Sequence, residues 1–153
     1  MNKQQFLAKF EPQNLIVNLK IDSIEQVFEK NYLSLAMIRK DFSLNFSKKY
    51  IILWLAMIDN FHKAERSDIE YNILACMIYN EYWYFTVADL NLLFKKALKT
   101  KVYGQLTAAI IMQIFENYEK ERNNIAEQIN YIEQIQEKRI SEERNLKQLI
   151  IHE

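Results

Sequence analysis

Glycine, proline and cysteine are almost missing from this chain, which has one of each among 153 residues. Tight turns and β-hairpins depend on glycine and proline, so their scarcity favours long helices joined by short polar turns. A single cysteine, Cys76, excludes an internal disulfide and fits a reducing compartment. With one glycine, neither the glycine-rich nucleotide-binding motifs nor the GxSxG motif of hydrolases is possible.

Net charge and long apolar runs are lacking as well. Lysine and arginine together number 20, as do aspartate and glutamate, so no overall field attracts nucleic acid or a membrane surface. The longest apolar run, Ile51 to Ile58, is far shorter than the roughly 20 residues that span a bilayer. Residues 1–13 have no apolar segment typical of a signal peptide. We therefore expect a cytoplasmic protein.

The pattern that is present is helical. Half of the residues are hydrophobic and 26% are charged, which is typical of a folded domain with its own core. Apolar residues recur at spacings of three and four residues in four segments, approximately 22–40, 48–64, 67–82 and 86–101. We expect these to be four core helices of an all-α bundle, with a turn at 43–47.

Two of these helices have clear start signals. Ser67 with Glu70 is spaced as a capping box. Thr86 is a candidate N-cap, and Asp89 at the third helical position is favourable to the helix dipole. In the third helix, the residues expected to face inward are Ile69, Ile73, Leu74, Met77 and Ile78. In the fourth, the expected buried stripe is Leu90, Leu93, Phe94 and Ala97.

A long last helix is expected from about Ala108 to Ile150, because this stretch contains no glycine or proline and follows a candidate cap at Thr107. A heptad with position a at Ile111 and d at Ile114 is only partly apolar, so any coiled coil is imperfect. We expect the second half of the helix to project and to need a partner. Its stripe for self-association or for another protein is Ile125, Ile129, Ile132, Ile135, Leu146 and Leu149.

The N-terminal segment has a different pattern. Pro12 interrupts any early helix, and Leu15–Ile21 is rich in β-branched and apolar residues. We expect an extended arm that packs on the bundle, or else a strand that pairs with another chain. The expected organisation is therefore an arm at 1–21, a helical core at 22–120, and a projecting helix at 121–153 that continues from the core.

The segment 82–104 has the strongest functional features. Trp83 and Tyr84 belong to an aromatic run that either packs the corner between two helices or forms an exposed contact patch. No acidic residue lies between Asp89 and Glu116. The basic residues in that window, with a neighbouring aromatic residue, are Lys95, Lys96, Lys99, Lys101 and Tyr103. These lysines either complement the helix dipole or contact phosphates, with Tyr103 stacking on a base.

Catalytic groups are not apparent. His62 and His152 are 90 residues apart, and neither has a further ligand at metal-binding spacing. Cys76 lies in an apolar stretch and suits a buried position better than that of a nucleophile. We expect no catalytic residue, no metal and no cofactor, and hence a protein that is not an enzyme.

Four motifs resemble a group of small helical proteins from Bacteroidetes chromosomes, mobile elements and phages. In order they are Tyr50–Leu55, Tyr82–Leu90, Phe94–Lys96 with Tyr103–Gly104, and Tyr118–Arg122. The chain departs from that pattern at Val102 and in its scarcity of glycine around it. The resemblance implies no known activity and transfers no catalytic residue. In size and layout the chain is also similar to phage helicase-loader and inhibitor proteins.

Together these features predict a non-enzymatic protein-interaction module of a phage or mobile element, with an accessory role in DNA replication as its expected setting. Its location would be the cytoplasm of the host cell or the virion. A structural or virion-associated oligomer is the first alternative. Single-strand nucleic-acid binding through the lysines is the second.

Overall fold

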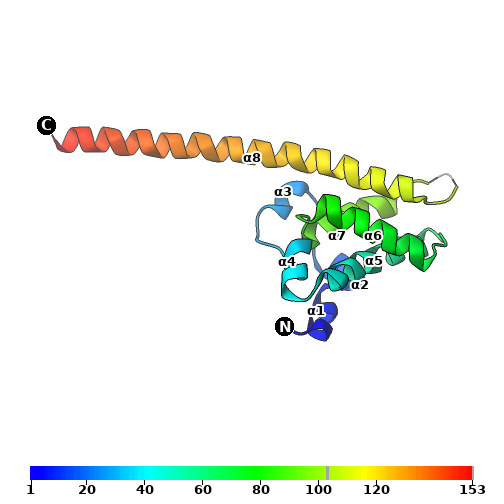
Figure 1. The fold of residues 1–153 in the computed structure, drawn as a ribbon. Helices are drawn as coiled ribbons and strands as arrows, with labels where there is room; N and C mark the ends of the chain where they lie inside the picture. Colours follow the sequence, from blue (N-terminus) through cyan, green and yellow to red (C-terminus); the bar gives the residue numbers. More distant parts are fainter. Residues whose placement is uncertain (103, 153) are drawn as a thin grey trace. The chain divides into compact units, whose positions relative to one another are not determined.

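The computed structural model describes residues 1–102 and 104–152, so Tyr103 and Glu153 lie outside the described residues. In that part of the chain there are eight helices and no β-strand, which confirms the all-α fold class with a long C-terminal helix (Figure 1). The helices are α1 (Lys3–Phe10), α2 (Pro12–Asn18), α3 (Ile24–Val27), α4 (Leu35–Asp41), α5 (Leu44–Phe61), α6 (Asp68–Tyr82), α7 (Val87–Lys99) and α8 (Ala108–Ile151).

The chain forms two compact units. Unit 1 is Met1–Tyr118, which comprises α1 to α7 and the first turns of α8. Unit 2 is Glu119–Glu153, and its described part is the remainder of α8 with His152. The hydrophobic core lies in unit 1.

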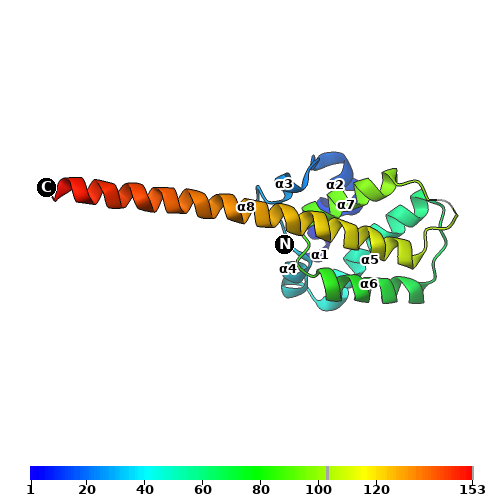
Figure 2. The same cartoon turned by 90° about the horizontal axis from the view of Figure 1, so that it is seen from above.

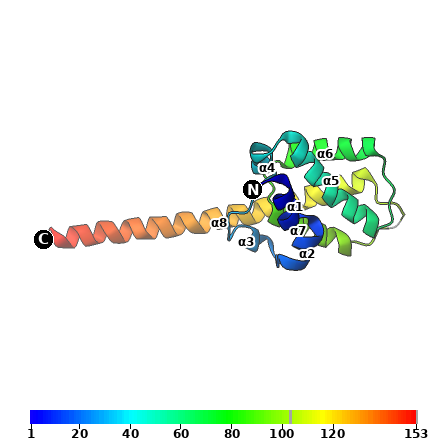
Figure 3. The ribbon, with the colours of Figure 1, turned by 90° about the horizontal axis from the view of Figure 1, so that it is seen from below.

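Helix α5 is the centre of unit 1, as its nearly continuous apolar sequence predicts. It contacts α2, α4, α6 and α7, and Figure 3 shows it between α6 and α7. Ile51, Trp54 and Leu55 are fully buried. The expected turn at 43–47 is wrong because Ser43 caps α5 by accepting from the Phe46 amide. Ser47, inside the helix, donates its hydroxyl to the Leu35 carbonyl at 2.9 Å.

The extended arm or strand expected at the N-terminus is also wrong, because residues 3–18 form two helices. Pro12 occupies the first turn of α2, where a missing N–H is not needed, so it begins a helix instead of only breaking one. Phe6 is 1% exposed and its ring packs on those of Phe42, Phe46 and Tyr50. Local propensity for extended structure is overridden here by burial of aromatic surface.

The single helix expected over 22–40 is divided into α3 and α4. Before and at the start of α4, the backbone of Leu33 and Leu35 pairs with Val87 at the start of α7 and with Phe85 just before it. Val87 donates to the Leu33 carbonyl at 2.8 Å, and Leu35 donates to the Phe85 carbonyl at 2.9 Å. These tertiary hydrogen bonds replace the intrahelical ones that the interruption removes. Seven helices therefore precede α8 in the described residues, where the sequence predicts four.

Buried Asp89 joins α7 to the first turns of α8. Its Oδ2 accepts from the Thr86 amide at 2.8 Å, and together with the predicted Thr86 side-chain cap this bond completes a capping box. Its Oδ1 accepts from the Tyr118 hydroxyl at 2.7 Å. Phe115 packs one turn earlier on the rings of Tyr82 and Phe94, so α8 begins against both α6 and α7 (Figure 2).

A buried ion pair closes the other end of unit 1. Arg66 donates to both carboxylate oxygens of Asp59, at 2.8 and 2.9 Å, and to the Leu106 carbonyl at 2.8 Å. The two charged side chains are 3% and 2% exposed. Desolvation and the neighbouring Asp59 raise the pKa of Tyr71 to about 12. This pair fixes the connection between α5 and α6 and the segment that leads into α8.

We expect Tyr118→Phe to lower the free energy of unfolding by about 1–2 kcal/mol, because the buried hydrogen bond from the Tyr118 hydroxyl to Asp89 is lost. Urea denaturation followed by circular dichroism measures the change. Tyr131→Phe is the matched control, since Tyr131 is 65% exposed, and its stability should stay at the wild-type value. Equal stability of the two variants would contradict the role given to the Asp89–Tyr118 hydrogen bond.

Candidate interaction surfaces

The corner between α6 and α7, residues 83–86, is held from two sides. Ala36 donates to the Trp83 carbonyl at 2.9 Å, and the Phe85 amide donates to the Tyr82 carbonyl at 2.9 Å. Inside the corner, the Phe85 ring is fully buried and stacks on Phe115 with an interplanar angle of 10°. The backbone of the corner is thereby fixed by both hydrogen bonds and packing.

The aromatic run of the corner is divided between core and surface. Tyr79, Tyr82 and Phe85 are buried, as the corner-packing interpretation expects. Trp83, by contrast, is 52% exposed, and its ring meets the half-buried ring of Tyr84 edge-on at 5.5 Å between centroids. Trp83 is therefore a large aromatic side chain that points outward from a backbone held by hydrogen bonds and packing.

The outward side of α6 extends the apolar surface from Trp83. Ile69, Ile73 and Met77, which the sequence predicts to face inward, are 71%, 55% and 42% exposed. That prediction is wrong because α6 is apolar on both sides, and Leu74, Ala75 and Ile78 are the residues that pack inward. Spacings of four and three residues join the outward positions into one face. We call this face the α6 surface: Ile69, Ile73, Cys76, Met77, Asn80 and Trp83.

An apolar groove runs beside the α6 surface. It has a volume of about 330 Å³ and lies between α6 and the first turns of α8. Ile73 and Met77 form one wall, and Ala108 and Met112 form the other. Short alanine side chains on α8 leave room for an inserted apolar side chain, so the α6 surface is not flat.

The lysines of α7 are only partly available. The Lys95 ammonium group donates to the Leu19 carbonyl at 3.1 Å, and that of Lys96 lies 5.8 Å from the centroid of the Tyr118 ring. Lys99 and Lys101 are exposed. Tyr103, the proposed stacking residue, lies outside the described residues. Two of the four lysines thus have contacts within unit 1 that phosphate binding would compete with.

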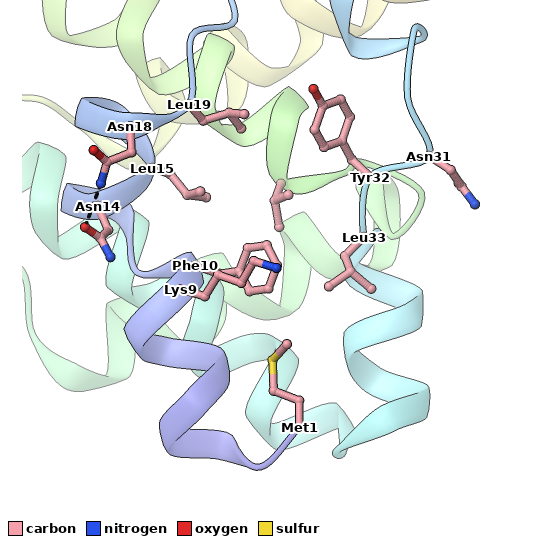
Figure 4. A pocket seen from close by; sticks show the side chains of 11 residues that line it. Met1, Lys9, Phe10, Asn14, Leu15, Asn18, Leu19, Asn31, Tyr32 and Leu33 are labelled. Carbon is pink, nitrogen blue, oxygen red and sulfur yellow. Dashed lines mark hydrogen bonds between the residues drawn. The ribbon is translucent and has the colours of Figure 1, made fainter.

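A pocket of about 660 Å³ between α1, α2 and residues 31–33 is the feature that the sequence misses (Figure 4). Phe10, Leu15, Leu19 and Val87 give it an apolar floor. The amides near its mouth bond within the chain, since Asn18 donates to Asn14 at 3.0 Å and Asn14 donates to the Ala8 carbonyl. The extended arm expected from the sequence would not form this pocket. Predicting the pocket requires predicting α1 and α2 first.

Unit 2 exposes many apolar side chains. Every residue from 131 to 152 is exposed. Ile132, Ile135, Leu146 and Leu149 of the predicted stripe are 54%, 38%, 60% and 67% exposed, whereas Ile125 and Ile129 are half-buried. A helix with this much exposed apolar surface is typical of one that packs against a partner.

The titratable groups of the described residues form no cluster of three or more histidine, cysteine, aspartate or glutamate side chains that would hold a metal. His62 is the C-cap residue that follows α5, and its Nε2 lies 3.3 Å from the Ala97 carbonyl oxygen. Cys76 is half-buried, and the Asn80 amide donates to its sulfur at 3.8 Å.

Over residues 1–102 and 104–152, none of the helices combines the length and the apolar character that a bilayer crossing requires.

Comparisons with known proteins give no match to any protein-family model, to any curated protein, or to any solved structure. The resemblance to small Bacteroidetes and phage proteins therefore depends only on the four motifs quoted above. Of these, Tyr82–Leu90 forms the corner and the start of α7, and Tyr118–Arg122 contains the donor to Asp89.

Tryptophan fluorescence tests the exposure of Trp83, because the other tryptophan, Trp54, is fully buried and stacked on Phe94. We expect Trp83→Phe to shift the emission to shorter wavelength and to reduce acrylamide quenching several-fold. Tyr84→Phe keeps both tryptophans and is the control. If Trp83→Phe leaves quenching unchanged, Trp83 is not on the surface.

Proposed function

We propose that this protein is a non-enzymatic interaction module and that the α6 surface is its contact site for another protein. The observation behind this proposal is the position of Trp83, which is 52% exposed on a corner that hydrogen bonds and buried aromatic rings hold in place. Tryptophan is among the residues that contribute most to protein–protein binding. A side chain held on a fixed backbone loses little conformational freedom when it binds.

The neighbouring residues suit the same role. Ile69, Ile73 and Met77 extend the apolar area along α6, and the groove beside them accepts an inserted side chain. Contiguous exposed apolar patches of this kind are typical of protein contact sites. Methionine at position 77 adds a flexible side chain that adapts to a partner.

The biological setting that we propose is a phage or mobile element, with a role as an accessory to DNA replication. Its support is the four-motif resemblance and the likeness in size and layout to helicase-loader proteins. A partner in that setting would be a protein of the replication machinery, bound through the α6 surface, while α8 mediates assembly.

Capture of partners tests the α6 surface. In a pull-down from Bacteroidetes cells that carry the phage or element, we expect the wild-type chain to bind a specific protein. With Trp83→Ala, the recovered amount of that protein should fall at least about tenfold, as for a central contact residue. Phe61→Ala is the matched control, because Phe61 is an aromatic residue of α5 with 64% exposure. A partner that binds Trp83→Ala as well as the wild type would place the contact elsewhere.

A structural, oligomeric role is the second candidate function. It is favoured by one observation, the exposed apolar side chains along unit 2. It is compatible with the first, since the α6 surface and unit 2 are different parts of the chain.

Single-strand nucleic-acid binding is the third candidate function and the least supported, because Lys95 and Lys96 have contacts within unit 1. If it is correct, binding must be strong at low salt and fall steeply as salt rises. We expect Lys99→Glu with Lys101→Glu to abolish such binding, because both lysines are exposed. Fluorescence anisotropy with a labelled oligonucleotide measures it, and undetectable binding at low salt would remove this candidate.

A further inference from the structure

We propose that unit 2 pairs with unit 2 of a second copy of this chain to form an antiparallel coiled coil. This inference deepens the assembly role proposed for α8, because it names the partner and its direction. It does not depend on the α6 surface.

The contact face is a seam of positions spaced alternately by four and three residues, the spacing of a coiled coil. The seam begins at Ile125 and runs through Ile129, Ile132, Gln136, Arg139, Glu143, Leu146 and Ile150. Relative to the heptad with position d at Ile114, each d position moves by one residue, so the seam uses Ile129, Gln136, Glu143 and Ile150 and leaves Ile135 and Leu149 of the predicted stripe at its flank. The seam is apolar at both ends and polar in the middle, and this arrangement determines which direction of pairing is favourable.

Parallel pairing would place each seam residue against its own copy. Arg139 would then meet Arg139, and Glu143 would meet Glu143, at two successive layers of the interface. Like charges forced together in a partly desolvated layer repel each other without compensation. The same direction would also set the acidic half of each helix beside the other acidic half.

Antiparallel pairing about the point between Glu137 and Lys138 removes both conflicts. Ile125 then faces Ile150, and Ile129 faces Leu146, so the apolar ends of the two helices cover each other. In the middle, Gln136 faces Arg139, and Glu137 lies beside Lys138 of the other copy. Arg139 faces Gln136 and Glu143 faces Ile132 in this register, so neither meets a like charge.

The charge distribution of unit 2 favours the same direction. Residues 123–137 contain three glutamates and no lysine or arginine, whereas residues 138–152 contain four basic residues and two glutamates. Antiparallel pairing sets the acidic half against the basic half in both places. Parallel pairing would gain only a pair between Glu142 and Lys147 at the rim, where exposed ion pairs contribute little.

The extent of the pairing matches the extent of unit 2. The register that centres on Glu137 and Lys138 sets position 152 of one copy opposite position 123 of the other. Both positions lie inside unit 2, which begins at Glu119. The coiled coil therefore needs no residue of unit 1, and the half-buried Ile125 is its outermost layer.

Sedimentation equilibrium of the full chain tests the pairing. We expect a dimer, and we expect Leu146→Asp to raise its dissociation constant by about 100-fold or more, because the charge is buried in an apolar layer. Leu146 is 60% exposed in the single chain, so the substitution does not disturb the fold of unit 1. Tyr131→Asp is the matched control, since Tyr131 is 65% exposed and lies off the seam, and it should remain dimeric.

Spin labels measure the direction of pairing. A label on Gln148→Cys, in a Cys76→Ala background, should report a separation of about 30 Å between copies in the antiparallel register, from a rise of about 1.5 Å per residue. Parallel pairing would place both labels at the same level along the axis, separated only by the width of the two-helix pair, about 20 Å or less. A separation of about 20 Å or less overturns the proposal.

A chain that stays monomeric at about 100 μM, or a trimer or tetramer, also overturns it and leaves unit 2 to a different partner. Loss of the dimer in Tyr131→Asp to the same degree as in Leu146→Asp would show that the seam is misplaced. Trp83→Ala should remain dimeric, so loss of an external partner by that variant, with the dimer intact, concerns the α6 surface alone.

Discussion

Asp89 is the residue on which the arrangement of unit 1 depends most. One of its carboxyl oxygens caps α7 through Thr86, and the other accepts from Tyr118 at the end of the part of α8 that belongs to unit 1. Because the group is fully buried, loss of either hydrogen bond lowers stability, since water cannot replace the lost donor. The corner that precedes α7 is therefore tied to α8 as well as to its own helix.

The corner in turn determines what the surface presents. Phe85 and Tyr82 point into the aromatic core around Phe115, and this fixes Trp83 on the outside. Pairing of the backbone with residues 33–36 holds the corner from the other side. A partner of the α6 surface would meet a preorganised aromatic side chain and not a mobile loop.

Much of the fold is predictable from the sequence, because its signals are local. The Ser67 and Thr86 caps, the buried stripe of α7 and the length of α8 follow from cap chemistry and helical spacing. The errors arise where contacts between residues far apart in sequence determine the local structure. Phe6 packs among aromatic residues of later helices, and Leu33 pairs with Val87, which no short sequence window contains.

The candidate surface was only half predictable for a related reason. The sequence singles out Trp83, either packed in the corner or exposed, but it does not single out the outward side of α6, because both sides of that helix are apolar and spacing alone cannot choose between them. The second role of Asp89, as acceptor of a hydroxyl 29 positions away in sequence, likewise has no local signal. Lys95 donates to the Leu19 carbonyl within unit 1. Its position in a run of lysines gives no sign of this contact.

Amide hydrogen exchange at the corner tests the central claim most directly, namely that the backbone that carries Trp83 is held in one conformation. The amides of Leu35, Ala36 and Val87 donate to the corner or to the segment paired with it. The account predicts that they exchange about as slowly as amides in the middle of α5, through opening of the whole core. Exchange at the rate of an unprotected loop would show a mobile corner and contradict the account.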